Sequence, residues 1–176
     1  LIGLPNAGKS TLISTVSEAK PKIADYPFTT LNPVLGIAKY NDNELVIADI
    51  PGLIEGAHEG KGLGDRFLGH IERCNLLLHL IDANDTDVIN SWKTVRNEIS
   101  AYSKELDEKK EIIVLSKSDS INEEKLDEKL IILKDYTNKD VFKMSSVTGK
   151  GITSILRILH DNISKTEDDD IKGWQP

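Results

Sequence analysis

The residues best suited to chemistry form one octapeptide, Gly3-Leu4-Pro5-Asn6-Ala7-Gly8-Lys9-Ser10, which Thr11 follows directly. This segment matches G-x-x-x-x-G-K-[ST], the pattern of a phosphate-binding loop. The two glycines allow a tight turn whose backbone N–H groups point inward and form a nest for an anion. Lys9 can reach the β- and γ-phosphates of a bound nucleotide, and the Ser10 hydroxyl can bind Mg²⁺. The motif therefore predicts a nucleoside triphosphate site, provided that a strand precedes it and a helix follows it.

Two later segments contain the oxygen and amide groups that a metal-bound triphosphate needs. The adjacent hydroxyls of Thr29 and Thr30 lie in a loop rich in turn formers, and we expect Thr30 to bind Mg²⁺, with Thr29 as the alternative. Considered alone, this pair is most simply two solvent-exposed loop hydroxyls. We expect Asp49 to bind Mg²⁺ through a water and the Gly52 N–H to meet the γ-phosphate. Lys9, Thr30 and Gly52 are expected to act on the transferring phosphate, with further nucleotide contacts from Phe28, Leu31, Asn32, Ile50 and Pro51.

The choice of base depends on Ser116-Lys117-Ser118-Asp119. The Asp119 carboxylate can accept two hydrogen bonds from guanine, one from N1–H and one from the N2 amino group. Adenine lacks this pair of donors, and leaving a buried carboxylate without partners is costly. The stem of Lys117 can pack on the face of the base, and Ser145-Ser146-Val147 can present backbone N–H groups to the guanine O6. Alone, the tetrapeptide also fits a plain strand-to-loop exit with a capping aspartate, but together with the other motifs it favours GTP.

The elements that must position these motifs alternate between strands and helices. Apolar runs predict strands, and apolar residues at helical spacing predict helices. This order predicts an α/β fold, a three-layer α/β/α P-loop NTPase whose sheet is mostly parallel with one antiparallel edge strand. Ligands bind at the carboxyl ends of strands in such sheets, and each motif directly follows a strand. The expected strands are 1–2 (truncated), 34–40, 44–49, 76–82, 111–115 and 140–144, the expected helices are 9–18, 65–74, 85–106, 122–134 and 152–163, and 19–33 and 53–64 are expected to be irregular loops.

Charge and composition narrow the class of protein. The net charge of −7 argues against sequence-blind nucleic-acid binding through a broadly basic surface. The single cysteine, Cys74, excludes an internal disulfide and suits a reducing cytosol. We expect residues 1–163 to form one nucleotide-binding domain and residues 164–176 to be an acidic, disordered tail. Because the chain lacks an initiating Met and begins inside a core strand, we interpret it as a piece of a longer protein.

Taken together, the motifs resemble those of translation-factor-type P-loop GTPases, and more closely those of the Obg family of ribosome-associated GTPases. The resemblance extends over residues 1–163. It implies an Obg-type G domain that binds GTP and GDP, hydrolyses GTP slowly with Mg²⁺, and serves large ribosomal subunit assembly and growth or stress control. It also implies a cytoplasmic location and a glycine-rich domain upstream, and we expect a monomer. Three stretches carry the resemblance: 22–31 (KIADYPFTTL), 49–64 (DIPGLIEGAHEGKGLG) and 67–74 (FLGHIERC).

Three positions deserve comparison with the family pattern. Ser116 replaces the asparagine of Asn-Lys-x-Asp, which normally touches the base and braces the phosphate loop, so we expect weaker nucleotide binding with unchanged specificity. Leu53 replaces the glutamine that orients water in Ras-like enzymes, so we expect slow intrinsic hydrolysis. Asn6 matches a position that in related GTPases can help to hold K⁺, which acts where an arginine finger otherwise does. Equally, Asn6 can be a side chain that only braces the loop.

These features predict a switch that GTP drives. GTP is expected to order residues 19–33 and 50–64 through the γ-phosphate and the metal, and hydrolysis is expected to release them. Two alternatives stay open. One is a nucleotide-responsive module that binds a ribosomal particle and hydrolyses GTP only incidentally. The other is an ATPase of the same fold, which Asp119 disfavours.

Overall fold

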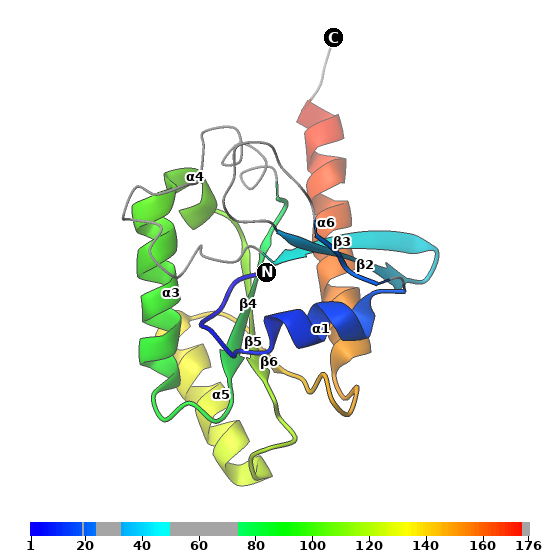
Figure 1. Ribbon diagram of the computed structural model, residues 1–176. Helices are drawn as coiled ribbons and strands as arrows, with labels where there is room; N and C mark the ends of the chain where they lie inside the picture. The colour runs from blue at the N-terminus through cyan, green and yellow to red at the C-terminus, as the bar shows by residue number, and fades with distance from the viewer. Residues whose placement is uncertain (19, 24–32, 50–73, 174–176) are drawn as a thin grey trace.

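Figure 1 shows the computed structural model, which describes residues 1–18, 20–23, 33–49 and 74–173. None of the helices in these ranges combines the length and the apolar character that crossing a bilayer demands. The helices are α1 (Lys9–Val16), α3 (Val88–Tyr102), α4 (Lys104–Asp107), α5 (Glu123–Thr137) and α6 (Ile152–Gly173). The strands are β1 (Lys22–Ile23), β2 (Val34–Tyr40), β3 (Asn43–Asp49), β4 (Leu77–Asp82), β5 (Glu111–Ser116) and β6 (Val141–Lys143).

The strands form two three-stranded sheets, antiparallel β1-β2-β3 and parallel β4-β5-β6. Leu1 and Ile2 lie between the two sheets. The Ile2 N–H donates to the Leu78 carbonyl and the Ile2 carbonyl accepts from the Leu80 N–H, both at 2.9 Å, which forms a parallel bridge to β4. On the other side, the Leu1 nitrogen donates to the Ala48 carbonyl of β3 at 2.7 Å. The two residues predicted to be a truncated first strand therefore connect the two sheets.

The predicted α/β fold class is confirmed, with a larger antiparallel part than the sequence indicated. The sequence predicted one antiparallel edge strand and no regular structure in residues 19–33. Instead, β1 pairs antiparallel with β2 through Lys22 opposite Leu35 and Ile23 opposite Val34. β2 has a free edge on the side away from β3, and β1 pairs there. Pro21, directly before β1, has no N–H to donate, so the hydrogen-bond ladder between β1 and β2 does not extend beyond Lys22 in that direction.

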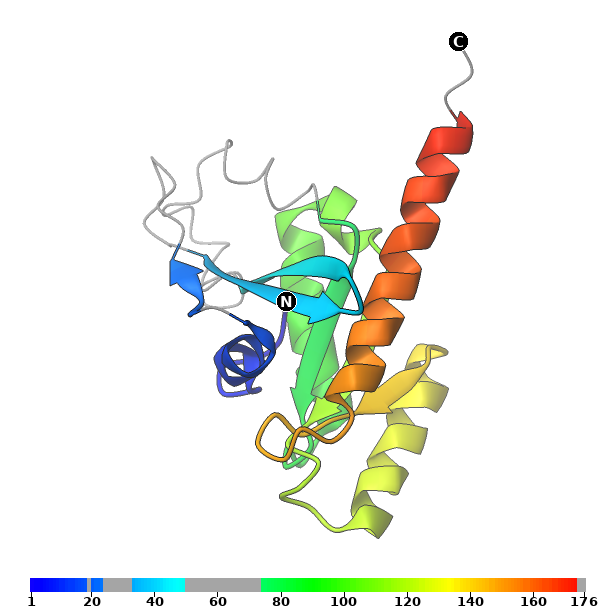
Figure 2. The same cartoon turned by 90° about the vertical axis from the view of Figure 1, so that its right-hand side faces the viewer.

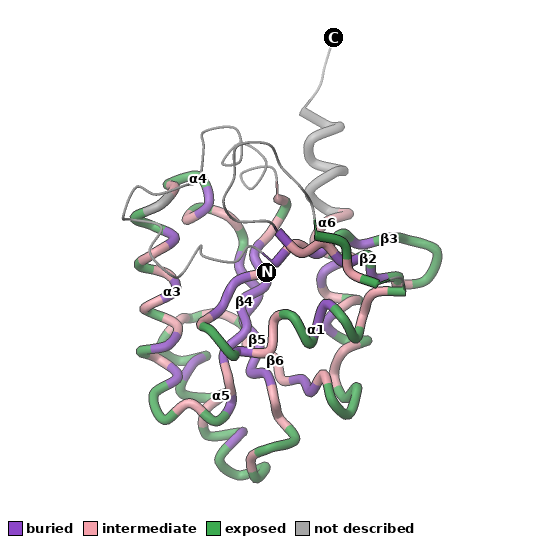
Figure 3. Tube along the Cα trace, in the orientation of Figure 1, coloured by how far each residue is buried: buried purple, intermediate pink, exposed green. Residues whose placement is uncertain are grey.

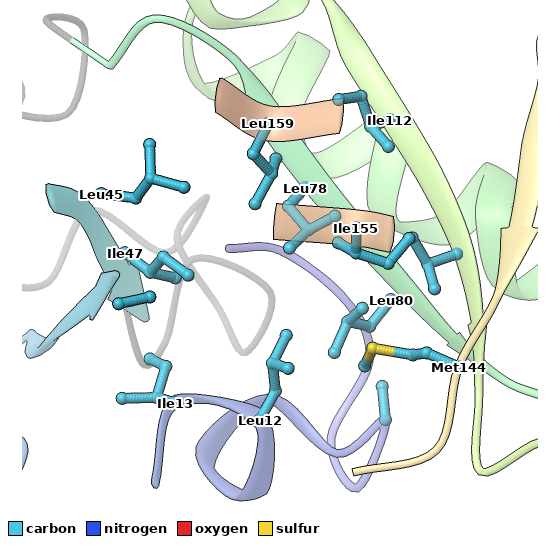
Figure 4. Close-up of a cluster of buried hydrophobic side chains, with 13 residues drawn as sticks. Leu12, Ile13, Leu45, Ile47, Leu78, Leu80, Ile112, Met144, Ile155 and Leu159 are labelled. Carbon is cyan, nitrogen blue, oxygen red and sulfur yellow. The ribbon is translucent and has the colours of Figure 1, made fainter. Parts of the chain in front are cut away.

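The parallel sheet has a buried core on each of its faces, as a three-layer fold requires. Side chains alternate along β5, so that Ile112 and Val114 join one apolar cluster while Ile113 and Leu115 join another. Figures 1 and 2 show α1 and α6 on one side of these strands and α3 and α5 on the other, and Figure 3 shows burial concentrated along β4 and β5. The first cluster includes Leu12, Leu78, Leu80, Met144, Ile155 and Leu159 (Figure 4), and the second includes Val88, Leu126 and Leu133.

The helices predicted over 85–106 and 152–163 differ most from their predicted bounds. The helix predicted over 85–106 is divided at Ser103, whose backbone is extended and whose hydroxyl oxygen caps α4 by accepting the Leu106 N–H at 3.3 Å. The structure continues α6 to Gly173, whereas acidic composition predicted a disordered tail from residue 164. No proline or glycine occurs within α6 before Gly173, so no breaker stops the helix earlier. The helix predicted over 65–74 lies outside the described residues, except for Cys74.

A buried ionic cluster lies where α3, β4 and β5 meet. The fully buried Glu111 carboxylate accepts hydrogen bonds from Lys139 Nζ at 2.6 Å and from Trp92 Nε1 at 3.2 Å. Nδ1 of the buried His79 lies 2.8 Å from the same carboxylate. Burial lowers the pKa of His79 although Glu111 opposes this shift, so the neutral ring donates its Nδ1–H. Burial raises the pKa of Glu111, but the hydrogen bonds from His79 and Lys139 outweigh it and lower this pKa to about 2.

Replacement of this carboxylate should change how stability depends on pH. Glu111→Gln should lower the free energy of unfolding at neutral pH by about 3 kcal/mol, because Lys139 and His79 lose a buried charged partner. The folded pKa of Glu111, about 2, lies below its ordinary value of 4.5, so its stabilisation is present above pH 4.5 and is lost as the pH falls toward 2. Across this acid range, urea unfolding should therefore show a smaller loss of stability for the variant than for the wild type. Glu128→Gln, at an exposed position of α5, is the matched control, and an unchanged acid profile in Glu111→Gln would contradict this account.

Candidate functional site

The octapeptide forms a tight loop between the Ile2 bridge and α1, as its motif predicted. Gly3 has φ 149° and Gly8 has φ 91°, and both values favour glycine. A Cβ on Gly3 would lie 2.4 Å from the Leu80 carbonyl oxygen, so no side chain fits there. Gly8 is the N-cap of α1, and it has no side chain to cover the N–H groups of the first turn. The loop therefore places the positive end of a helix dipole at the site predicted to hold phosphates.

Lys9 folds back over this loop. Its Nζ donates to the carbonyl oxygens of Gly3 at 2.9 Å and Leu4 at 3.1 Å. The two acceptor residues lie six and five residues before Lys9 in the chain, so these bonds hold the ammonium group at the start of the loop. A cation in this place can attract the phosphate oxygens that the N–H groups of the loop also attract.

Ser10 and Asp49 meet across α1 and the end of β3. The Ser10 hydroxyl lies 3.5 Å from Oδ2 of Asp49, which is a long contact. Asp49 is only 5% exposed, and its Oδ1 has no hydrogen-bond partner in the described part of the chain. A buried carboxylate oxygen without a donor is unfavourable unless a cation or water meets it. The pair therefore fits Mg²⁺, which takes oxygen ligands and few protein groups.

Ser116 links the segment predicted to recognise the base to the phosphate loop. This residue ends β5 and is 2% exposed. Its Oγ lies 2.7 Å from the Ala7 carbonyl and 3.1 Å from the Ile81 carbonyl, and its single proton can be donated to one of them at a time. The family resemblance implied that a longer asparagine at this position normally braces the phosphate loop. In this chain the shorter serine hydroxyl still reaches the loop.

Lys117 has a partner that was not predicted from the sequence. Its Nζ forms an ion pair with Oδ2 of Asp82, at 2.5 Å. Burial raises the pKa of Asp82, but hydrogen bonds from Lys117 and Asn84 outweigh it and hold this pKa below its usual range. A signal for Asp82 was present in the sequence, because it is the polar last residue of an apolar strand beside the strand that ends in the base motif.

The remaining groups predicted to contact the base differ from the prediction in two respects. Asp119 is exposed, whereas selection of guanine was predicted from a buried carboxylate. The Ser145 N–H donates to the Lys150 carbonyl at 2.9 Å, so it is not available to a guanine O6. Ser145 is fully buried within a tight turn, which explains this internal bond. Ser146 and the 81% exposed Val147 remain as the candidate amide donors, and the Ser118 N–H joins the two loops through the Met144 carbonyl at 3.0 Å.

Several predicted site residues fall outside the described part of the chain. Their contacts to a nucleotide or a metal therefore stay predictions. These residues are Phe28, Thr29, Thr30, Leu31, Asn32, Ile50, Pro51, Gly52 and Leu53.

Comparison with known sequences agrees with the motifs. A family model described as "50S ribosome-binding GTPase" matches residues 1–117. A protein named GTPase Obg from Rickettsia akari (strain Hartford) is 57% identical over 158 residues, which cover 90% of this chain and 48% of that protein. GTPase Obg from Rickettsia felis is 55% identical over 167 residues, covering 95% of this chain and 51% of that protein. The resemblance to Obg GTPases is confirmed, and the chain spans about half the length of the curated relatives it matches.

Solved structures share the fold at lower sequence identity. Nucleolar GTP-binding protein 1 from Plasmodium falciparum superimposes with a TM-score of 0.66 at 24% identity, covering 96% of this chain and 87% of that chain. The cytosolic domain of the T. maritima FeoB iron transporter in its apo form gives a TM-score of 0.68 at 18% identity, covering 92% and 61% of the two chains. At these identities the likeness concerns the fold alone.

The brace from Ser116 can be tested by removing its hydroxyl. Ser116→Ala should lower the free energy of unfolding by about 1 kcal/mol, because the Ala7 carbonyl loses a buried donor. Hydrogen exchange should also become faster at the backbone amides of the phosphate loop. Ser100→Ala changes an exposed serine of α3 and is the control. Equal stability and equal exchange in the two variants would contradict a bracing role for Ser116.

Proposed function

Because the chain belongs to the family described as 50S ribosome-binding GTPase, we propose that it binds GTP and GDP and hydrolyses GTP as a nucleotide switch. The observation that carries this proposal is the 2.7 Å contact between the Ser116 hydroxyl and the Ala7 carbonyl. It joins the segment predicted to select the base to the segment predicted to bind the phosphates. One nucleotide can therefore contact both segments at once.

Asp119 is the group proposed to select guanine. Its exposed carboxylate can accept the N1–H and N2 amino protons of the base, and adenine offers no such pair. Bound guanine would shield these hydrogen bonds from water. The amides of Ser146 and Val147 are the proposed donors to O6, and the stem of Lys117 is proposed to cover one face of the base.

Mg²⁺ is the proposed metal, and Ser10 and Asp49 are the described residues that would hold it, the aspartate through a water. When bound, it would neutralise charge on the phosphate oxygens. Among the described residues, Oδ1 of the buried Asp49 has no hydrogen-bond partner, and this supports the assignment. Thr30 is the further ligand proposed from the sequence.

The chain itself supplies charge and hydrogen bonds for phosphoryl transfer to water. Lys9, held at the loop by the Gly3 and Leu4 carbonyls, is proposed to stabilise charge that develops between the β- and γ-phosphates. The Gly52 N–H is proposed to donate to a γ-phosphate oxygen. Leu53 has no polar group with which to orient the attacking water, so slow intrinsic hydrolysis is proposed.

The proposed partner of the switch is the large ribosomal subunit. Two facts support it: the family description names binding to the 50S ribosome, and the relatives that cover most of this chain are named GTPase Obg. A role in subunit assembly and in growth or stress control is proposed on the same basis. The cytoplasm, where such particles are found, is the proposed location, and residues 19–33 and 50–64 are proposed to change with the nucleotide.

Potassium is proposed to accelerate hydrolysis through Asn6. This side chain is exposed on the phosphate loop, and its φ of 66° is left-handed. In K⁺, turnover should be at least about tenfold faster than in Na⁺ at equal ionic strength, since a fixed cation can stabilise the transition state. Asn6→Gly removes the amide but tolerates this φ, so it should abolish the difference. Asn41→Gly, which replaces another left-handed asparagine, is the control, and equal wild-type rates in the two salts would contradict the proposal.

The function as a whole is tested by nucleotide affinity. Measured by fluorescence titration with and without Mg²⁺, the protein should bind GTP and GDP at least about 100-fold more tightly than ATP. Asp119→Asn should shift this preference toward xanthosine nucleotides, because an amide can donate to the xanthine C2 carbonyl. Asp135→Asn, at an exposed position of α5, should bind as the wild type does. Equal affinity for ATP and GTP would refute the proposed function, and an unchanged GTP preference in Asp119→Asn would refute the role of that residue.

A further inference from the structure

A closed ring of side chains joins the end of β4 to the loop that follows β5. Lys117 Nζ pairs with Oδ2 of Asp82 at 2.5 Å. The other carboxylate oxygen of Asp82 accepts from both the backbone N–H and the side-chain amide of Asn84, each at 2.9 Å. The Asn84 amide also donates to the Ser120 hydroxyl at 2.7 Å, and this hydroxyl donates to the Lys117 carbonyl at 2.7 Å. Both ends of Lys117, its ammonium and its backbone, are therefore fixed by the same ring.

The backbone of Lys117 is in a conformation that needs such support. Its φ is 55°, in the left-handed region that residues other than glycine rarely adopt. The Ser120 N–H donates to the Lys117 carbonyl at 3.0 Å, and the Ser118 N–H donates to the Met144 carbonyl at 3.0 Å. Such a conformation persists only when the surroundings determine it, and here bonds on both sides do so. The lysine stem consequently leaves the backbone in one fixed direction.

The register of the parallel sheet brings Asp82 to this place. Asp82 is aligned with Ser116, so β4 and β5 end together and Lys117 is the next residue along. The Asp82 side chain is 17% exposed and that of Lys117 is 38% exposed, so the pair is partly shielded from water. Partial shielding makes an ion pair more persistent than one at the open surface. The bonds from Lys117 and Asn84 also keep the pKa of Asp82 below its usual range, so its carboxylate is ionised at neutral pH.

We infer that Asp82 is a positioning residue for guanine-nucleotide binding, because it holds Lys117 Nζ and so presents the stem of this lysine to the face of the base. The inference rests on the proposed function, in which Lys117 packs on guanine. Asp82 need not touch the nucleotide. Without its anchor, a lysine side chain samples many rotamers, and binding would have to order it each time.

Asp82→Asn is the variant that tests this inference, because it removes the charge and changes the shape little. The Kd for a fluorescent GDP analogue should rise about tenfold, and KM for GTP should rise similarly while kcat stays within about twofold. Asp82→Glu, which restores a carboxylate, should recover most of the affinity. The matched control is Asp107→Asn, which breaks the ion pair between Asp107 and Arg96 at the α3–α4 connection and should leave nucleotide affinity unchanged.

A double-mutant cycle separates positioning from a general structural role. Lys117→Met keeps an unbranched stem and removes the ammonium group that Asp82 holds. In this background, Asp82→Asn should change the Kd by less than about twofold. The same loss in both backgrounds, or wild-type affinity in the single variant, would overturn the inference alone. Failure of the wild type to bind guanine nucleotides would instead overturn the proposed function, and this inference with it.

Discussion

The close contact between the phosphate loop and β4 is the constraint on which the rest of the site depends. The Leu80 carbonyl would lie 2.4 Å from a Cβ at Gly3, and the Leu80 N–H donates to the Ile2 carbonyl. The loop is therefore fixed to the middle of β4 on one side and enters α1 on the other. Since β4 and β5 end in register at Asp82 and Ser116, the loops after both strands lie at the same edge of the sheet as the phosphate loop. This backbone contact and the register of β4 with β5 together determine where three distant segments of the chain meet.

Much of this arrangement could be predicted from local patterns. The glycine, lysine and serine spacing of residues 3–10 predicted both the loop and the helix after it, and the apolar runs at 76–82 and 111–115 predicted two buried parallel strands. The bracing hydroxyl of Ser116 could not be predicted, because its acceptor lies 109 residues away in the chain. The same reason applies to Lys117 and Asp82, which are 35 residues apart. β1 was not predicted either, because a strand of two residues has no recognisable alternation of apolar and polar side chains. Its two residues form a strand only by pairing with β2, which lies further along the chain.

The two ends of β5 have different roles: one end carries a buried ionic cluster that stabilises the fold, and the other contacts the candidate site. Glu111, at its start, holds the cluster of Lys139, Trp92 and His79 between the strands and α3. Ser116, at its end, reaches the phosphate loop. Between them the strand is apolar and buried on both faces. Acid conditions that discharge Glu111 therefore act on the stability of the whole fold, through groups that lie away from the candidate site.

Two buried atoms that have no hydrogen-bond partner among the described residues differ in charge and in location. In the described part of the chain, Oδ1 of Asp49 and Nε2 of His79 both lack a partner. The Asp49 oxygen belongs to a carboxylate next to Ser10, which the phosphate-loop motif predicts to bind Mg²⁺, so a cation held there would neutralise it. The His79 ring is neutral, fully buried and already bonded to Glu111 through its other nitrogen. An unpaired nitrogen on a neutral ring is a modest energetic cost within the core, whereas an unpaired oxygen on a buried carboxylate next to Ser10 favours a ligand.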